Sequence, residues 1–556
     1  MERQSRCNCF GNIPDKDIEK CTDLDATRDF TIKRGKMSLI KQYLIDYTAN
    51  SNLHGLKYVG EKERTTVEKA FWLLMFTCSI VFCSSLIHKL WMKWNDSPVI
   101  VTFAETSTPV WQIPYPAVTL CAEMKVKQTS FNYTEYYNLK RKPTNVEEAH
   151  LFEDLTMICN KIVDPWTHGR NFTLGNETVK NIKKVSPSLK DIFTTITWKD
   201  KLCPDLNLFL PILTEEGYCY TFNTISANQL LRIENLNTDY NYLKSSNEKQ
   251  TWTLENGYPP NTPFETYPHR GTGYGDNAGL SLLLQAKKKD FDYLCSGPIQ
   301  GFKILLHNPA DFPRLSQQYL SISLGRNVII AVKPKMMTTS EGLKSYNPRR
   351  RQCFFSSERY LRFFKVYTQV NCETECLTNF TYVRCGCVHF GMPHGPEMRV
   401  CSVGKLDCII RARMDLVTVE VQSNLEEAAN TDDSMGEARR VATNCKCLPA
   451  CTSIEYEAEI SQGDFNAEAL YRALNYPLVE DIVSTLHTQT KIFFKEAQFN
   501  EVRRSELYGQ TDFLANCGGL LGLFLGFSIL SIVEIIYFLT LRICCILWRR
   551  RQNSKI

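Results

Sequence analysis

One stretch near the C-terminus, residues 513–541, limits what this chain can fold into. Its first 21 residues carry no formal charge, and Glu534 is the one charged residue in the whole stretch. A straight helix of this length would measure about 43 Å, whereas the hydrocarbon core of a bilayer is about 30 Å thick. We therefore predict a membrane-spanning segment that tilts, kinks or breaks.

Glycines indicate where such a break would fall. Three of them are spaced by three and four residues, which places them on one helical face and permits close approach of another helix: Gly519, Gly522 and Gly526. Residues 526–528, Gly-Phe-Ser, would add flexible backbone and a hydroxyl at membrane depth, where irregular backbone is tolerated only beside a cavity. Glu534 is a costly carboxylate within the span and indicates a polar pathway. A single-pass anchor with a small-residue dimerisation face is the simpler alternative.

A second apolar run, residues 70–87, has 18 uncharged residues and is the short end of a spanning helix. Basic residues precede it, and Arg549, Arg550 and Arg551 follow the C-terminal run, so we expect both flanks to be cytoplasmic. The chain between the two runs would then be extracellular. Four N-glycosylation sequons agree with this topology: Asn132, Asn171, Asn176 and Asn379.

These features predict an α+β fold with two transmembrane helices around a large disulfide-rich extracellular domain. The expected parts follow one another along the chain: a cytoplasmic segment (1–69), the first span (70–91), the extracellular domain with a β-rich core and peripheral helices (92–510), the second span (511–541) and a cytoplasmic tail (542–556). Both spans are expected to be surrounded by membrane lipid.

The 23 cysteines are informative through their placement, because 15 of them lie between Cys121 and Cys451. That density is natural for a fold in an oxidising compartment. The C-x3-C and C-x-C spacings could be metal ligands, but His is scarce nearby and the segment is expected to be extracellular, so we predict disulfides, with no metal site and no cofactor. A net charge of +5 on 556 residues does not point to a nucleic-acid partner.

Apolar runs and alternations predict buried strands in the extracellular domain, at residues 115–121, 217–223, 279–284, 301–309, 318–333 and 453–460. Cys372 and Cys376 are one helical turn apart and would share a helical face. Cys445 and Cys447 would lie on one side of an extended strand. This geometry suits two adjacent disulfides between a helix and a strand, and spacing leaves their connectivity open.

Taken together, several motifs resemble the epithelial sodium channel/degenerin family, in particular its pickpocket-type insect members. The matching segments run in order along nearly the whole chain: His54-Gly55, YPAVTLC at 115–121, GYCYTFN at 217–223, GFKILLHNP at 301–309, CKCLPAC at 445–451 and LANCGGLLGLFLGFS at 514–528.

The resemblance implies a trimeric, sodium-selective and amiloride-sensitive channel of the plasma membrane, assembled from like or related subunits, with sodium ions as its cargo and no catalysis. Its selectivity filter would be Gly526, Phe527 and Ser528, although a smaller residue is commoner at the middle position. His54 and Gly55 would form a re-entrant turn that supports the filter. The remaining gating and pore positions would be Ala515, Gly519 and Glu534.

The resemblance also implies a disulfide pattern that leaves Cys295 without a partner: Cys121–Cys219, Cys159–Cys203, Cys353–Cys451, Cys372–Cys447, Cys376–Cys445, Cys385–Cys408 and Cys387–Cys401.

Two other classes of protein share the two-span plan. A ligand-gated non-selective cation channel, such as an ATP-gated one, would need a basic cluster for the triphosphate. A membrane-anchored receptor or ectoenzyme would have no pore, and the His-Glu-x-x-His and Gly-x-Ser-x-Gly signatures of such enzymes do not occur in the sequence.

Overall fold

The structure, a computed structural model, describes residues 37–61, 63–96, 99–138, 146–159, 177–204, 206–240, 252–424, 436–475 and 484–553. The chain divides into two compact units. We call Met1–Pro98 with Leu507–Ile556 the membrane unit and Val99–Glu506 the cysteine-rich unit. Each is described by itself.

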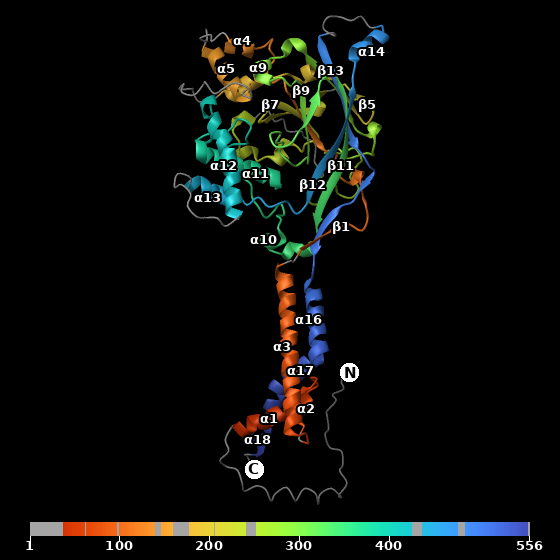
Figure 1. The fold of residues 1–556 in the computed structure, drawn as a ribbon, viewed down its shortest axis with the longest axis vertical. Coiled ribbons are helices and arrows are strands. Elements are labelled where there is room, and N and C mark those ends of the chain that lie inside the picture. Colours follow the sequence, from red (N-terminus) through yellow and green to blue (C-terminus); the bar gives the residue numbers. More distant parts are fainter. Residues whose placement is uncertain are drawn as a thin grey trace, which may run out of the picture. The chain divides into compact units, whose positions relative to one another are not determined.

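The membrane unit contains one continuous long helix and one broken helix (Figure 1). The long helix, α3 (Thr66–Asp96), runs for 31 residues, and neither glycine nor proline interrupts it. The C-terminal stretch forms α16 (Gln510–Leu525), α17 (Ile529–Leu539) and α18 (Leu541–Asn553), so the predicted break is confirmed. Two helical stretches among the described residues are long and apolar enough to cross a membrane: Thr66–Asp96 and Ile529–Trp548. Two shorter helices precede α3: α1 (Met37–Asn50) and α2 (Leu56–Gly60).

Two sheets form the centre of the cysteine-rich unit. The larger has the strand order β1-β15-β11-β13-β8-β4-β5, with β12 paired to β11, and the smaller has the order β10-β9-β3-β7-β6. The larger sheet contains β1 (Val99–Phe103), β4 (Phe193–Trp198), β5 (Lys201–Cys203), β8 (Leu280–Lys287), β11 (Arg326–Thr339), β12 (Ser453–Asp464), β13 (Thr485–Phe494) and β15 (Val502–Glu506). The smaller contains β3 (Ala117–Ala122), β6 (Phe209–Thr214), β7 (Gly217–Phe222), β9 (Gly301–His307) and β10 (Leu320–Ser323). A separate two-stranded pair joins β2 (Thr108–Pro109) to β14 (Gln498–Phe499).

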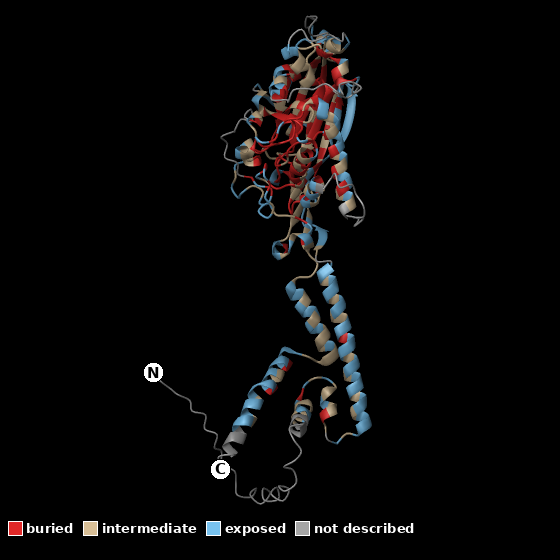
Figure 2. Cartoon of the chain, turned by 90° about the vertical axis from the view of Figure 1, so that its left-hand side faces the viewer, coloured by how far each residue is buried: buried red, intermediate tan, exposed pale blue. Residues whose placement is uncertain are grey.

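All six predicted strand regions contain strands, and their burial follows their place in the sheets. Every residue of β3 is buried, because β3 lies between β9 and β7. In β8 buried residues alternate with half-buried ones, as expected for a strand with one face in the core. Figure 2 shows buried residues concentrated on the central strands of this unit, while the long helices of the membrane unit are largely exposed.

Helices surround the sheets, and three of them gather on one side of the strands in Figure 1: α11 (Gln369–Cys385), α12 (Leu406–Asn424) and α13 (Gly436–Cys445). The Thr368 side chain caps α11 by accepting a hydrogen bond from Asn371 N, and Gly386 ends it with a φ of 75°. The remaining helices are short or peripheral: α4 (Tyr133–Asn138), α5 (Val146–Cys159), α6 (Thr178–Val185), α7 (Leu189–Ile192), α8 (Ala227–Leu230), α9 (Tyr293–Ser296), α10 (Pro348–Arg351) and α14 (Ala467–Ala473).

Six of the expected disulfides are present: Cys121–Cys219, Cys353–Cys451, Cys372–Cys447, Cys376–Cys445, Cys385–Cys408 and Cys387–Cys401. The expectation that two adjacent bridges join a helix to a strand is wrong. Cys445 is the last residue of α13, and Cys447 lies in the irregular segment after it. Cys376–Cys445 therefore joins α11 to the end of a second helix, and Cys372–Cys447 joins α11 to the segment just after that helix. A helix forms here because residues 436–445 contain helix formers rather than an alternating strand pattern.

The expected Cys159–Cys203 bridge is also wrong, because Cys159 pairs with Cys295. Cys159 ends α5 and Cys295 lies in α9, and these two helices pack together. Cys203 instead ends β5, at the edge of the larger sheet, and has no disulfide partner among the described residues.

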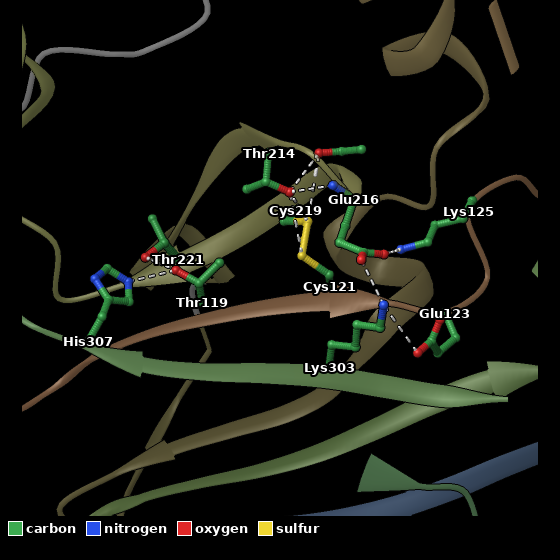
Figure 3. The surroundings of a disulfide bond; sticks show 11 residues. Thr119, Cys121, Glu123, Lys125, Thr214, Glu216, Cys219, Thr221, Lys303 and His307 are labelled. Atoms are coloured by element: carbon green, nitrogen blue, oxygen red, sulfur yellow. Dashed lines mark hydrogen bonds and ion pairs between the residues drawn. A yellow bond between two sulfur atoms is a disulfide. The ribbon is translucent and has the colours of Figure 1, made fainter. Parts of the chain in front are cut away.

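Charged side chains are buried beside the Cys121–Cys219 bridge (Figure 3). Lys125 Nζ lies 2.5 Å from Glu216 Oε2, and Lys303 Nζ lies 2.7 Å from Glu216 Oε1. Lys303 also approaches Glu123 at 3.8 Å and lies 4.6 Å from the ring centroid of Tyr319. The two lysines and two carboxylates balance in charge, which is how buried ions become tolerable.

Candidate functional site: the break in the second span

The break at residues 526–528 is built by local capping on both sides. Gly526 ends α16 in the left-handed region, with a φ of 63°, and its N–H donates to Gly522 O at 2.9 Å. Ser528 is the N-cap residue just before α17, and its Oγ accepts a hydrogen bond from Ser531 N at 3.3 Å. Gly526, Phe527 and Ser528 consequently lie outside both helices, at a point where the neighbouring helix ends leave backbone groups to be satisfied by other partners.

His54 lies directly against this break. Its N–H donates to the carbonyl of Leu525, the last residue of α16, at 3.0 Å. A methyl group built on Gly526 would lie 2.8 Å from three atoms of the His54 ring, so the ring fills the space that a side chain would need. Two features therefore require glycine at 526, the left-handed backbone and the close approach of the ring.

Gly55 allows the chain to turn immediately after this contact. Its φ is 84°, and it precedes α2, whose Tyr58 ring lies 4.6 Å from the Trp72 ring on α3. A side chain on Gly55 would also approach Trp72. The expected His54-Gly55 pair is thus brought to the predicted filter segment, and α2 connects it to the first span.

Glu534 lies in α17, the helix that follows the break. Its Oε2 accepts a hydrogen bond from Asn52 Nδ2 at 3.2 Å. The carboxylate that the sequence places within the span is therefore held by a residue two positions before His54. The importance of Asn52 was not predicted, because nothing in the sequence near 52 marks a contact with a residue 482 positions away.

Ala515 and Gly519 lie on an exposed face of α16. No atom of the described residues lies within 4 Å of a methyl group built on Gly518 or Gly519. The other face packs against the first span, where Phe513 contacts Trp91 and Trp94 and where Phe524 stacks on Phe82 at 6.4 Å. Within one chain, the structure brings His54, Gly55 and Glu534 to the region of the break and leaves Ala515 exposed.

Gly526 does not extend a helical glycine face, because α16 ends at Leu525. It is the cap that terminates the helix. The expectation that Gly519, Gly522 and Gly526 share one helical face is therefore correct only for the first two.

The sequons occupy different settings. Asn132 precedes α4 and accepts a hydrogen bond from Glu135 N at 2.9 Å, whereas Asn379 is half-buried within α11. Asn171 and Asn176 lie outside the described residues.

Buried titratable groups occur in the cysteine-rich unit. Burial raises the pKa of Asp311 to about 7, and Glu455 and Glu373 nearby act in the same direction against a hydrogen bond from Thr368. Burial lowers the pKa of His307 and of His389 to about 4, so both rings are neutral at physiological pH.

Most of this chain is similar in sequence to known proteins. The family described as "Amiloride-sensitive sodium channel" matches residues 47–538, which include both His54-Gly55 and the break. Pickpocket protein 28 of Drosophila melanogaster is 27% identical over 93% of this chain and 81% of its own length. The sodium channel protein Nach of the same species is 23% identical over 89% of this chain and 86% of its own length. Acid-sensing ion channel 1A of Danio rerio is 21% identical over 89% of this chain and 87% of its own length.

Proposed function

This chain belongs to the amiloride-sensitive sodium channel family and is a cation-channel subunit with two membrane spans, and from that premise we propose that it forms a sodium-selective, amiloride-sensitive channel of the plasma membrane. It is not an enzyme. Sodium ions would move passively down their electrochemical gradient, and both termini would lie in the cytoplasm. The proposed assembly is a trimer of like or related subunits.

The observation that carries this proposal is the non-helical Gly526-Phe527-Ser528 segment with His54 against it. Around a pore axis, copies of this segment would present backbone carbonyls and the Ser528 hydroxyl to a partly dehydrated ion. Rings of such oxygens replace the water that an ion loses. Phe527 suits this role if its side chain points away from the pore, so that only its backbone lines the filter.

Glu534 and Ala515 receive distinct roles in the proposal. Glu534 would raise the local concentration of cations through the field of its carboxylate. Ala515 and Gly519, on the open face of α16, would lie where the second spans of the subunits converge. The cysteine-rich unit would transmit the activating signal to that convergence.

The decisive test replaces filter atoms and measures ion preference. Ser528→Ala and Gly526→Cys should each change the sodium-to-potassium permeability ratio, or abolish current, in channels that still reach the cell surface. Ser85→Ala is the matched control, because Ser85 is an exposed serine on α3. An unchanged reversal potential in both filter variants, with current still flowing, would reject the filter.

Ionic conditions separate the alternatives. A sodium-selective channel reverses near the sodium potential and is blocked by amiloride. A non-selective ligand-gated channel reverses near zero in mixed sodium and potassium, and a receptor without a pore carries no current under any of these conditions.

A further inference from the structure

The chain before His54 lies along the second span, and we call residues 43–54 the strap. Tyr47 contacts the ring of Phe538 edge-on with the centroids 5.1 Å apart, and Tyr43 does so at 6.4 Å. The Tyr43 hydroxyl also donates a hydrogen bond to the Phe538 carbonyl. Phe538 is only 6% exposed, so its ring is well packed in this aromatic contact.

Charged and polar contacts also join the strap to the second span, on both sides of Phe538. Asp46 forms an ion pair with Arg542, whose guanidinium lies 4.6 Å from the centroid of the Phe538 ring. Asn52 donates to Glu534 at 3.2 Å, and His54 N donates to Leu525 O at 3.0 Å. The contacts therefore run antiparallel to the span, from Arg542 back to the break.

The strap is also fixed to the first span. A methyl group on Gly60 of α2 would lie 2.5 Å from Ala49 N of α1, which shows how closely α2 folds back on α1. Through the contact between Tyr58 and Trp72, α2 packs on α3. A shift of the strap along the second span would therefore have to disrupt this packing.

We infer that Asp46 and Arg542 are positioning residues of the channel, whose ion pair sets the register of the strap and so keeps His54 against Gly526. Among the described residues, this is the one ion pair between the strap and the second span. The inference rests on the proposed filter at 526–528. Neither residue touches the filter, so their effect on ion preference would be transmitted by the strap.

The expected size of the effect follows from the exposure of the pair. The Arg542 and Asp46 side chains are 31% and 42% exposed, and ion pairs of this kind shift an equilibrium by about two- to fivefold. Asp46→Arg or Arg542→Asp should therefore reduce the ratio of docked to undocked strap by about that factor. The exchanged pair, Asp46→Arg with Arg542→Asp, should restore it.

Docking is measured without current, through a second contact of the strap. Asn52→Cys with Glu534→Cys places two thiols where the wild-type side chains hydrogen bond, and copper phenanthroline oxidises them to a disulfide in isolated membranes. The rate of crosslinking should fall in each single charge variant and recover in the exchanged pair. The variants with one introduced cysteine exclude pairing with native thiols.

Arg362 and Glu397 provide the matched control pair. They are 2.6 Å apart and similarly exposed, and they lie in the cysteine-rich unit. Exchanging them should leave the crosslinking rate unchanged. Equal crosslinking rates in the wild-type, Asp46→Arg and Arg542→Asp backgrounds would overturn the inference.

The permeability ratio then separates this inference from the proposed function. If the filter lies at 526–528, the sodium-to-potassium ratio should change in the single charge variants and return in the exchanged pair, at equal surface density. A crosslinking response without any change in the ratio would sustain the docking role and count against the filter. Loss of surface protein in the single variants, restored by the exchanged pair, would also support the ion pair, because only its re-formation explains the rescue.

Discussion

Asp311 follows β9 in the cysteine-rich unit and lines a cavity of about 690 Å³ together with Glu455. Its N–H donates to Asn308 O at 2.9 Å, which fixes the turn that carries the carboxyl group inward. The raised pKa has a definite consequence for folding. A carboxyl group whose pKa is higher in the folded state stabilises the fold below its ordinary pKa, and that contribution is lost as the pH rises through the folded value of about 7.

We predict that the free energy of unfolding falls between pH 5 and pH 8.5 in the wild type. Asp311→Asn should remove much of this fall. Between pH 5 and the folded pKa of about 7 the loss covers about two pH units, which corresponds to about 3 kcal/mol. Thermal unfolding of the full chain in detergent, followed by fluorescence across this pH range, measures the slope. Asp464→Asn, at a residue whose side chain is 87% exposed, is the control. A variant with the wild-type slope would show that Asp311 is not the titrating group.

The Cys159–Cys295 disulfide, found in place of the expected Cys159–Cys203 bridge, leads to a second prediction. Cys295→Ser removes the bridge to Cys159, and loss of a native bridge costs about 2–5 kcal/mol in small secreted domains. Cys203→Ser changes a thiol that has no disulfide partner among the residues that the structure describes, and it should cost less than about 0.5 kcal/mol. Surface biotinylation should therefore show a deficit for Cys295→Ser and a normal level for Cys203→Ser. A deficit for Cys203→Ser with a normal level for Cys295→Ser would instead support the Cys159–Cys203 pairing.

Among the structural elements, the strands and the break were predictable because their causes are local. Apolar runs mark β3, β8 and β12, and Gly526 marks the end of α16. The Cys159–Cys295 pairing was not predictable, because it depends on the packing of α5 against α9, a helix of only four residues. The strap was missed for the same reason. Tyr43 and Phe538 are 495 positions apart, and no local pattern records their contact.

The exposed face of α16, which carries Ala515, leads to a prediction about channel gating. Ala515 is exposed in one chain, and convergence of three such helices would leave no room for added methyl groups. Ala515→Val should hold the spans apart and give a constitutive sodium leak, seen as increased resting current at equal surface density. Ala70→Val makes the same change at an exposed position on α3. Quiescence of an otherwise functional Ala515→Val channel would contradict the gate.

For the whole molecule, the topology predicts which side of the membrane each part occupies. Asn132→Gln and Asn379→Gln should each remove one step of the mobility shift produced by peptide-N-glycosidase. Asn132 lies at the start of a surface helix, whereas Asn379 is half-buried, so glycan addition at Asn379 would have to precede complete folding of α11. A tag at the N-terminus should stay inaccessible to antibody on intact cells. Labelling of that tag on intact cells would exclude two spans with both termini inside.

The pairing of β1 with β15 has a mechanical consequence. Strand β1 follows α3 in the chain and β15 precedes α16, and the two are antiparallel neighbours from Val99↔Glu506 to Phe103↔Val502. Tension along either strand therefore loads the same short ladder, whose hydrogen bonds run across the strands and share such a load in shear. From β15 the load passes to β11 through Met337–Thr339, and β11 carries it into the larger sheet. The two connections thus behave as one tether rather than as two independent ones.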